Sequence, residues 1–89
     1  SYENLIFYPN PLKLKEHNKM IFSGLQSENY IKIISLSGEE IIQLNVTGGG
    51  YSWNLNDIRG KKIVPGTYLI FILSEYGGEG QLAGKFLVL

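Results

Sequence analysis

Side chains that could do chemistry gather in one short stretch, residues 53–62. Its acid and amides are the oxygen donors that calcium prefers. A calcium loop needs five or more oxygen ligands at set positions and a late bidentate glutamate. Here Leu55 and Ile58 interleave with the donors, and no such glutamate follows. We therefore expect Asn54, Asn56 and Asp57 to bend the backbone through local hydrogen bonds.

The same stretch carries a basic cluster, Arg59, Lys61 and Lys62, which could contact phosphate or an acidic partner. The chain as a whole has eight basic and eight acidic residues and a formal net charge of zero. It therefore has no general attraction for nucleic acid or an anionic membrane. No aromatic residues interleave with the cluster to form a stacking platform for bases. We expect a solvated turn and no nucleic-acid partner.

Residues for catalysis or metal binding are sparse. His17 is the only histidine, it lies in a Lys- and Glu-rich segment, and there is no cysteine. A zinc site and a Ser-His-Asp arrangement therefore lack their ligands and base. Residues 78–83 match a relaxed dinucleotide fingerprint, but that motif must open a helix, and residues 84–89 after it are typical of a strand. We expect a non-enzymatic protein without a metal or other cofactor.

The pattern along the chain is that of an all-β domain. Turn signals recur every 8–12 residues or so and separate short runs rich in β-branched and aromatic residues. No apolar run approaches the ~20 residues of a spanning helix, so we expect no direct membrane insertion. The pattern predicts a single domain over residues 1–89, an immunoglobulin-like antiparallel β-sandwich of about seven strands. Residues 1–7 would be a linker or first strand; the predicted strands are 5–8, 19–22, 30–36, 40–46, 51–55, 67–74 and 82–89.

Alternation within the strands predicts which side chains form the core. Tyr51, Trp53 and Leu55 fall on one face of their strand, and we expect Trp53 and Leu55 to point inward. The strand at 67–74 is apolar on both faces, as in a strand covered on both sides. Its outer face is expected to be covered by loops or to meet another domain or partner. The last strand is also apolar on both faces, because Phe86 and Val88 alternate with Leu87 and Leu89.

The motif YPNP, residues 8–11, has a mechanical interpretation. Proline fixes its own φ, disfavours helix at the residue before it and cannot donate to a sheet ladder. The motif is therefore expected to be extended and to lie at a sheet edge or a strand exit.

These motifs occur in a recognisable order. YPNP is followed by Ile31-x-Ile33, by Leu36-Ser37-Gly38, by Trp53 to Gly60, by Gly66-x-Tyr68 and by a closing Gly84-Lys85-Phe86-x-Val88. Over residues 8–89 the chain resembles the type A C-terminal sorting domain of the type IX secretion system, also known as the Por secretion tail.

The resemblance implies a secretion signal domain that directs an attached upstream cargo across the outer membrane. It implies the secretion machinery and a sortase-like peptidase as partners, and a cut near or before Ser1. The domain would pass through the bacterial periplasm and reach the cell surface or the medium. The implied recognition residues are Tyr8, Pro9, Asn10 and Pro11 as the opening motif and Lys85, Phe86, Leu87, Val88 and Leu89 as the end that the machinery reads.

The resemblance also marks a structural signature, with Gly38, Gly60 and Gly66 at turns and Trp53 and Tyr68 in the core. An apolar C-terminal edge strand would fit capture by strand addition. Two alternatives stay open. The segment from Trp53 to Tyr68 also resembles the small sandwich of flagellar hook-capping proteins, a structural or adhesive accessory module. A carbohydrate-binding module would use Trp53, Tyr51 and Tyr76 as stacking residues.

Overall fold

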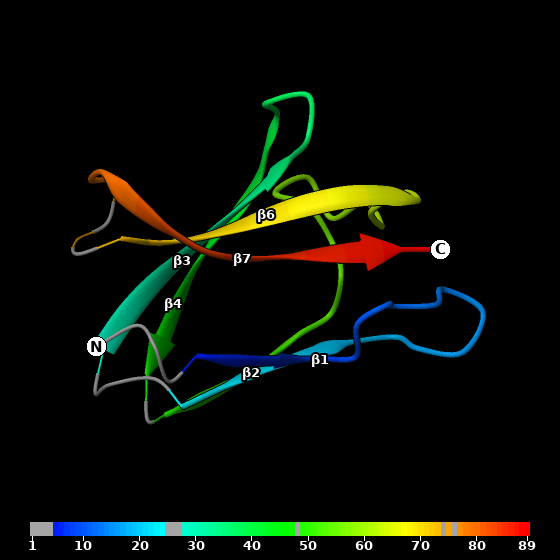
Figure 1. Cartoon of the computed structure of the whole chain (residues 1–89), viewed down its shortest axis with the longest axis horizontal. Helices are drawn as coiled ribbons and strands as arrows, with labels where there is room; N and C mark the ends of the chain where they lie inside the picture. Colours follow the sequence, from blue (N-terminus) through cyan, green and yellow to red (C-terminus); the bar gives the residue numbers. More distant parts are fainter. Residues whose placement is uncertain (1–4, 25–27, 48, 74, 76) are drawn as a thin grey trace.

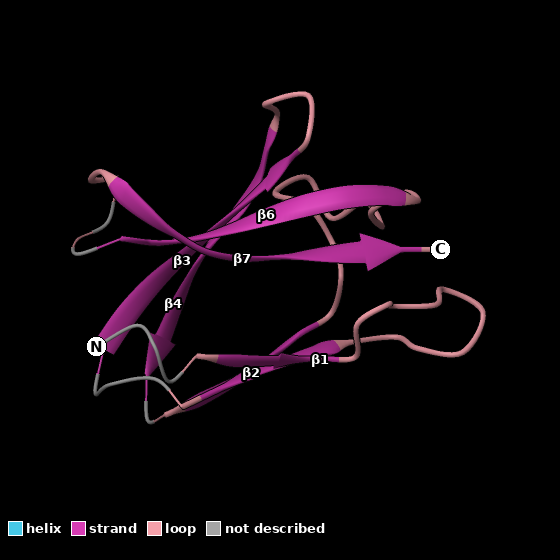
Figure 2. Cartoon of the chain, viewed as in Figure 1, coloured by secondary structure: helices cyan, strands magenta, loops and turns pink. Residues whose placement is uncertain are grey.

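A computed structural model describes residues 5–24, 28–47, 49–73, 75 and 77–89. In this part of the chain every regular element is a strand (Figures 1 and 2). Two antiparallel sheets form a sandwich, one with the order β1-β2-β5 and one with the order β4-β3-β6-β7. The strands are β1 (Ile6–Tyr8), β2 (Met20–Ser23), β3 (Glu28–Ser35), β4 (Glu40–Thr47), β5 (Gly50–Trp53), β6 (Gly66–Leu73) and β7 (Gly80–Val88).

The seven strands predicted from the turn spacing are thus confirmed, with ends that differ by at most two residues. The segment between β1 and β2 consists of turns and loop. Of the predicted linker, residues 1–4 lie outside the described residues, and β1 takes up most of the remainder.

The core lies between the two sheets and is almost wholly apolar. Alternate residues of β2, β3, β4, β6 and β7 point into it, as the period of two along a strand requires. Its fully buried large side chains are Trp53, Phe22, Phe86, Leu12, Met20, Ile31, Ile33, Leu55, Ile70, Ile72 and Val46.

The predicted inward face of β5 is right for Trp53 but differs at its neighbours. Trp53 is buried, whereas Tyr51 stays 38% exposed because β5 is an edge strand at the rim of the smaller sheet. Leu55 is buried, yet it lies beyond the end of the strand with a φ of 70°. It reaches the core through a bend of the backbone and not through strand alternation.

The YPNP motif moves the chain from one sheet to the other. β1 is the edge strand of the smaller sheet and ends at Tyr8, so the predicted strand exit is confirmed. The motif is not extended throughout, since the backbone bends at Asn10 and Pro11, and both X-Pro peptide bonds are cis. Beyond the bend, Leu12 forms a parallel bridge with Val88 of β7, in the larger sheet. The bend is what allows this crossing.

Candidate functional site

The acid and amides of residues 54–61 hold a corner of the backbone. Asn54 Oδ1 accepts a hydrogen bond from the Asn56 amide at 3.1 Å. Asp57 Oδ1 accepts from the amides of Arg59 and Lys61, both at 2.9 Å. The bond from the Lys61 amide is the main cause that holds the pKa of Asp57 below its usual value of 3.8. The expected bend-forming role is confirmed for the side chains of Asn54 and Asp57, whose oxygens are engaged by the loop's own amides, whereas Asn56 contributes its backbone amide and carbonyl.

The basic cluster lies on the outside of this corner. Arg59, Lys61 and Lys62 are all exposed, as a solvated turn requires. Lys62 Nζ also donates to the Asn54 carbonyl at 3.0 Å, which ties the two arms of the corner together. Gly60, at the tip, has a φ of 84°, a conformation that residues with a side chain rarely adopt.

Three aromatic rings in contact connect the corner to the last strand. Phe86 of β7 stacks on Tyr68 with ring centroids 5.4 Å apart and forms a T-shaped pair with Trp53, with centroids 6.4 Å apart. Trp53 Nε1 donates to the Asn56 carbonyl at 3.0 Å, and the Tyr68 hydroxyl donates to the Val64 carbonyl at 2.5 Å. Burial raises the pKa of Tyr68. Trp53 is 1% exposed, so its predicted core position is confirmed and its ring faces cannot stack on a sugar.

Of the other two glycines predicted at turns, Gly38 lies in a turn and Gly66 lies in a strand. Gly38 lies in the turn between β3 and β4 with a φ of 97°, and Gly66, with a φ of 153°, is the first residue of β6. Tyr76, the third candidate for sugar stacking, lies outside the described residues.

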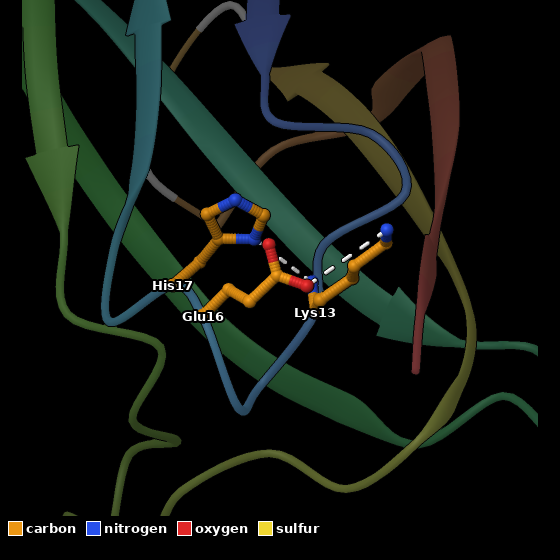
Figure 3. A network of polar contacts seen from close by, with 3 residues as sticks. All are labelled: Lys13, Glu16 and His17. Carbon is orange, nitrogen blue, oxygen red and sulfur yellow. Dashed lines mark hydrogen bonds and ion pairs between the residues drawn. The ribbon is translucent and has the colours of Figure 1, made fainter.

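His17 makes a hydrogen bond within its own loop. Its Nδ1 accepts a hydrogen bond from the Lys13 amide at 2.9 Å, while the Lys13 and Glu16 side chains form an ion pair at 3.9 Å (Figure 3). The ring nitrogen thus closes a turn. Among the described residues no group of three or more His, Cys, Asp and Glu side chains could hold a metal ion. In the same part of the chain no helix is long and apolar enough to cross a membrane.

The two motifs at the ends of the resemblance, 8–11 and 85–89, meet in space. Asn10 is the link, since its side-chain amide donates to the Lys85 carbonyl at 3.3 Å and accepts from the Leu87 amide at 3.0 Å. These are the bonds that a neighbouring strand would make along the edge of β7. A shallow hollow of about 210 Å³ lies beside them, lined by Asn10, Thr67, Lys85, Phe86 and Leu87.

Backbone bonds continue this pairing to the end of the chain. The Leu12 amide donates to the Leu87 carbonyl at 2.7 Å, the Leu89 amide to the Leu12 carbonyl at 2.8 Å, and the Leu14 amide to the Leu89 carbonyl at 2.9 Å. The outer edge of residues 85–89 is therefore already paired. The expectation that a partner captures this edge by strand addition is wrong, because the edge has no free backbone row to offer.

What remains accessible in residues 85–89 is one set of side chains. Phe86 and Val88 are buried in the core, whereas Leu87 is 41% and Leu89 54% exposed. Lys85 is exposed on the same outward side. A partner of the folded domain can thus contact three of the five residues of the predicted recognition end.

Sequence reasoning missed the contribution of residues 10–14 to this site. Residues 12–14 lie between the predicted strands 5–8 and 19–22 and belong to neither of them. The alternation of apolar and charged residues from Leu12 to Lys15 was the available signal, since period two is typical of a strand with one buried face. We refer to residues 10–14 and 85–89 together as the C-terminal edge unit.

Comparison with known proteins shows that this fold also occurs in two solved bacterial structures. No family model and no curated protein matches the chain. Two solved structures from Porphyromonas gingivalis share the fold: PorZ, an essential surface component of the type IX secretion system, and dimeric latent PorU. The TM-scores are 0.76 and 0.74, the identities 24% and 22%, and 96% of this chain is covered in both. The match spans 11% of the PorZ chain and 9% of the PorU chain.

Proposed function

We propose that this domain is a C-terminal secretion signal of the type IX secretion system. It directs an attached upstream cargo across the outer membrane, and a sortase-like peptidase then removes it. It passes through the periplasm of a bacterium and ends at the cell surface or in the medium. In this proposal it acts by binding alone and is not an enzyme.

The observation that carries the proposal is the C-terminal edge unit. The two motifs that the resemblance names as recognition elements are 75 residues apart in sequence, yet Asn10 joins them through two hydrogen bonds. A domain that is read at this place presents both motifs at once. The fold shared with segments of PorZ and PorU adds support, because PorZ is itself a component of that system.

The proposed mode of recognition follows from what is accessible. Since the backbone edge of residues 85–89 is paired internally, the machinery would contact the side chains of Lys85, Leu87 and Leu89. Transfer of a leucine side chain from water into an apolar pocket contributes about 1.5–3 kcal/mol. Leu87 and Leu89 are only 41% and 54% exposed, so each can supply part of that amount. They contribute to a contact whose remaining area must come from the surrounding surface.

The test uses a periplasmic reporter fused ahead of the whole chain and expressed in a bacterium with a type IX system. Deleting residues 85–89 would also remove Phe86 and Val88 from the core, so the informative variant is L87S/L89S, which changes exposed side chains only. We expect the wild-type fusion at the cell surface and the variant retained in the periplasm. A matched control strain that lacks the type IX system should retain both.

Surface delivery of the wild-type fusion in the strain without the system would overturn the proposal. So would equal delivery of the wild type and of L87S/L89S, which is what a structural or adhesive accessory module predicts.

A further inference from the structure

The strand β4 forms one edge of the larger sheet, and the hydrogen bonds of its neighbour β3 show how its backbone is oriented. The Ser35 amide donates to the Glu39 carbonyl at 2.8 Å, on the side of β4, and the Leu36 amide donates to the Thr67 carbonyl at 3.2 Å, on the side of β6. The backbone groups of successive residues in a strand point to alternate sides. The odd-numbered residues of β3 therefore face β4.

Two residues of β4 turn their backbone groups away from the sheet. Ile31 of β3 lies opposite Leu44, so the backbone of Leu44 faces β3, and the N–H and C=O groups of Gln43 and Asn45 on either side of it face outward. The Gln43 side chain accepts a hydrogen bond from the Gly77 amide at 3.2 Å. In the part of the chain that the structure describes, no backbone group bonds to these outward groups.

The other three edges of the sandwich are short or covered, whereas β4 is long and open. β1 and β5 have three and four residues, and the edge of β7 is paired with residues 12–14. Short strands, charges, prolines and bulges are the usual protection of an edge. β4 has eight residues, and residues 41–47 contain no charge and no proline. Its start is protected by a bulge at Ile41, whose carbonyl accepts from the Ile58 amide at 3.1 Å, and pairing is open beyond it.

A groove of about 310 Å³ lies beside this edge, between the two sheets. Its apolar lining consists of Ile42 and Leu44 of β4, Tyr51 and Trp53 of β5, and Ile58 of the corner, and polar residues of β5 and the corner line the rest. Tyr51 is 38% and Ile58 74% exposed, so the apolar lining is open to solvent. A strand that pairs with β4 would direct every second side chain toward this groove.

We infer that β4 binds an extended segment of a partner protein by strand addition, with apolar side chains at every second position seated in the groove. This inference does not rest on the proposed function, and it concerns the edge opposite the C-terminal edge unit. The outward backbone groups select a strand as the partner, because an extended backbone offers N–H and C=O groups at the matching spacing. A second copy of this domain would leave the groove empty, since Leu44 and Val46 of its own β4 are only 5% and 0% exposed.

The probe is a short acetylated peptide in which Val and Thr alternate between terminal lysines. Residues directly opposite in an antiparallel pair share a face, so Thr would bond to Gln43 and Asn45 while Val points to the groove. Methylation of the Thr amide nitrogens removes these bonds, whereas methylation of the Val amide nitrogens changes only the far edge of the peptide. In an NMR titration of the full chain up to about 1 mM peptide, we expect the Asn45 amide signal to shift. The Thr-methylated peptide should bind about tenfold more weakly than the Val-methylated control.

A matched pair of variants tests the same bond from the side of the protein. N45P removes the outward N–H, at an edge position that proline tolerates, and the control N45T keeps it. We expect N45P to weaken binding of the unmethylated peptide by about tenfold and N45T to bind like the wild type, with circular dichroism showing that both fold.

Equal binding of the two methylated peptides would overturn the inference, because the peptide would then be held by its side chains alone. Failure of the wild-type chain to bind any of the peptides would overturn it as well. A dimer in gel filtration that N45P dissociates would assign the edge to a second copy and would also contradict the inference.

Discussion

The corner at residues 53–68 and the C-terminal edge unit differ in the opposite way from what their composition suggests. The polar corner stabilises the fold, and the apolar edge unit presents side chains that a partner can contact. The corner holds one acid, two asparagines and three basic residues close together. The structure uses several of them internally: Asp57 accepts two amides, and Lys62 closes onto the Asn54 carbonyl. The edge unit is apolar and looks like plain core. There, Leu87 and Leu89 remain exposed.

The contrast separates the residues that stabilise this small domain, which has no disulfides, from the residues that are free to bind a partner. Polar groups at a tight corner must satisfy backbone amides that would otherwise be lost to solvent or left unbonded. Exposed leucines have no such structural duty. They cost solubility unless a partner covers them, and so they are the better indicator of function in this molecule.

The largest effect is expected for Trp53, the residue that connects the corner to the core. W53A removes a fully buried ring and its contact with Phe86. Such a deletion costs about 3–5 kcal/mol, a large part of the about 5–15 kcal/mol that stabilises a typical domain. Urea unfolding followed by circular dichroism measures this loss of stability, because the signal does not depend on Trp fluorescence. A cost similar to that of I58A, an exposed control on the same loop, would contradict a core role for Trp53.

A smaller effect is expected in the edge unit, at Asn10. N10A removes both side-chain hydrogen bonds to β7. It should lower the free energy of opening at the Leu87 amide by about 1–2 kcal/mol, which raises the hydrogen-exchange rate of that amide by a factor of roughly 5–30. The Leu89 amide, which donates to the Leu12 carbonyl, is the internal control and should change less. Equal acceleration of both amides would mean that the whole domain opens, and Asn10 would then have no local role.

The smallest effect is expected for Asp57 and depends on pH. Hydrogen bonds from the loop amides lower its pKa in the folded state, so its stabilising contribution is present above the ordinary pKa of 3.8 and is lost as pH falls through the lowered value. The D57N variant cannot titrate at this position. The difference in urea midpoint between wild type and D57N should therefore shrink between about pH 5 and about pH 2. A difference that grows on acidification would contradict this sign.

The sequence was sufficient for the strands, the core and the bend at Asn54 to Asp57, because these depend on local alternation and on side chains that bond within a few residues. It was insufficient for contacts that close over the whole chain. Asn10 bonds residues 75 and 77 positions away, and nothing local distinguishes it from an ordinary turn asparagine. The strand-addition hypothesis failed for the same reason, since the partner of the C-terminal edge is the chain's own residues 12–14.

For the outer surface of β6 the sequence left two possibilities open: that loops cover it, or that it meets another domain or a partner. Half-buried Leu69 and Phe71, with exposed Leu82 beside them, favour the second. Exposure of a strand face depends on what the rest of the chain places over it, and that is a tertiary property which alternation cannot give.

The most direct test of the account compares the two regions in one secretion assay. The reporter fusion carries either R59S/K61S/K62S, which removes the basic cluster of the corner, or L87S/L89S in the edge unit. We expect the corner variant to reach the cell surface like the wild type and the edge variant to fall by about tenfold or more. Loss of delivery in the corner variant, with normal delivery of the edge variant and both domains folded, would contradict the account.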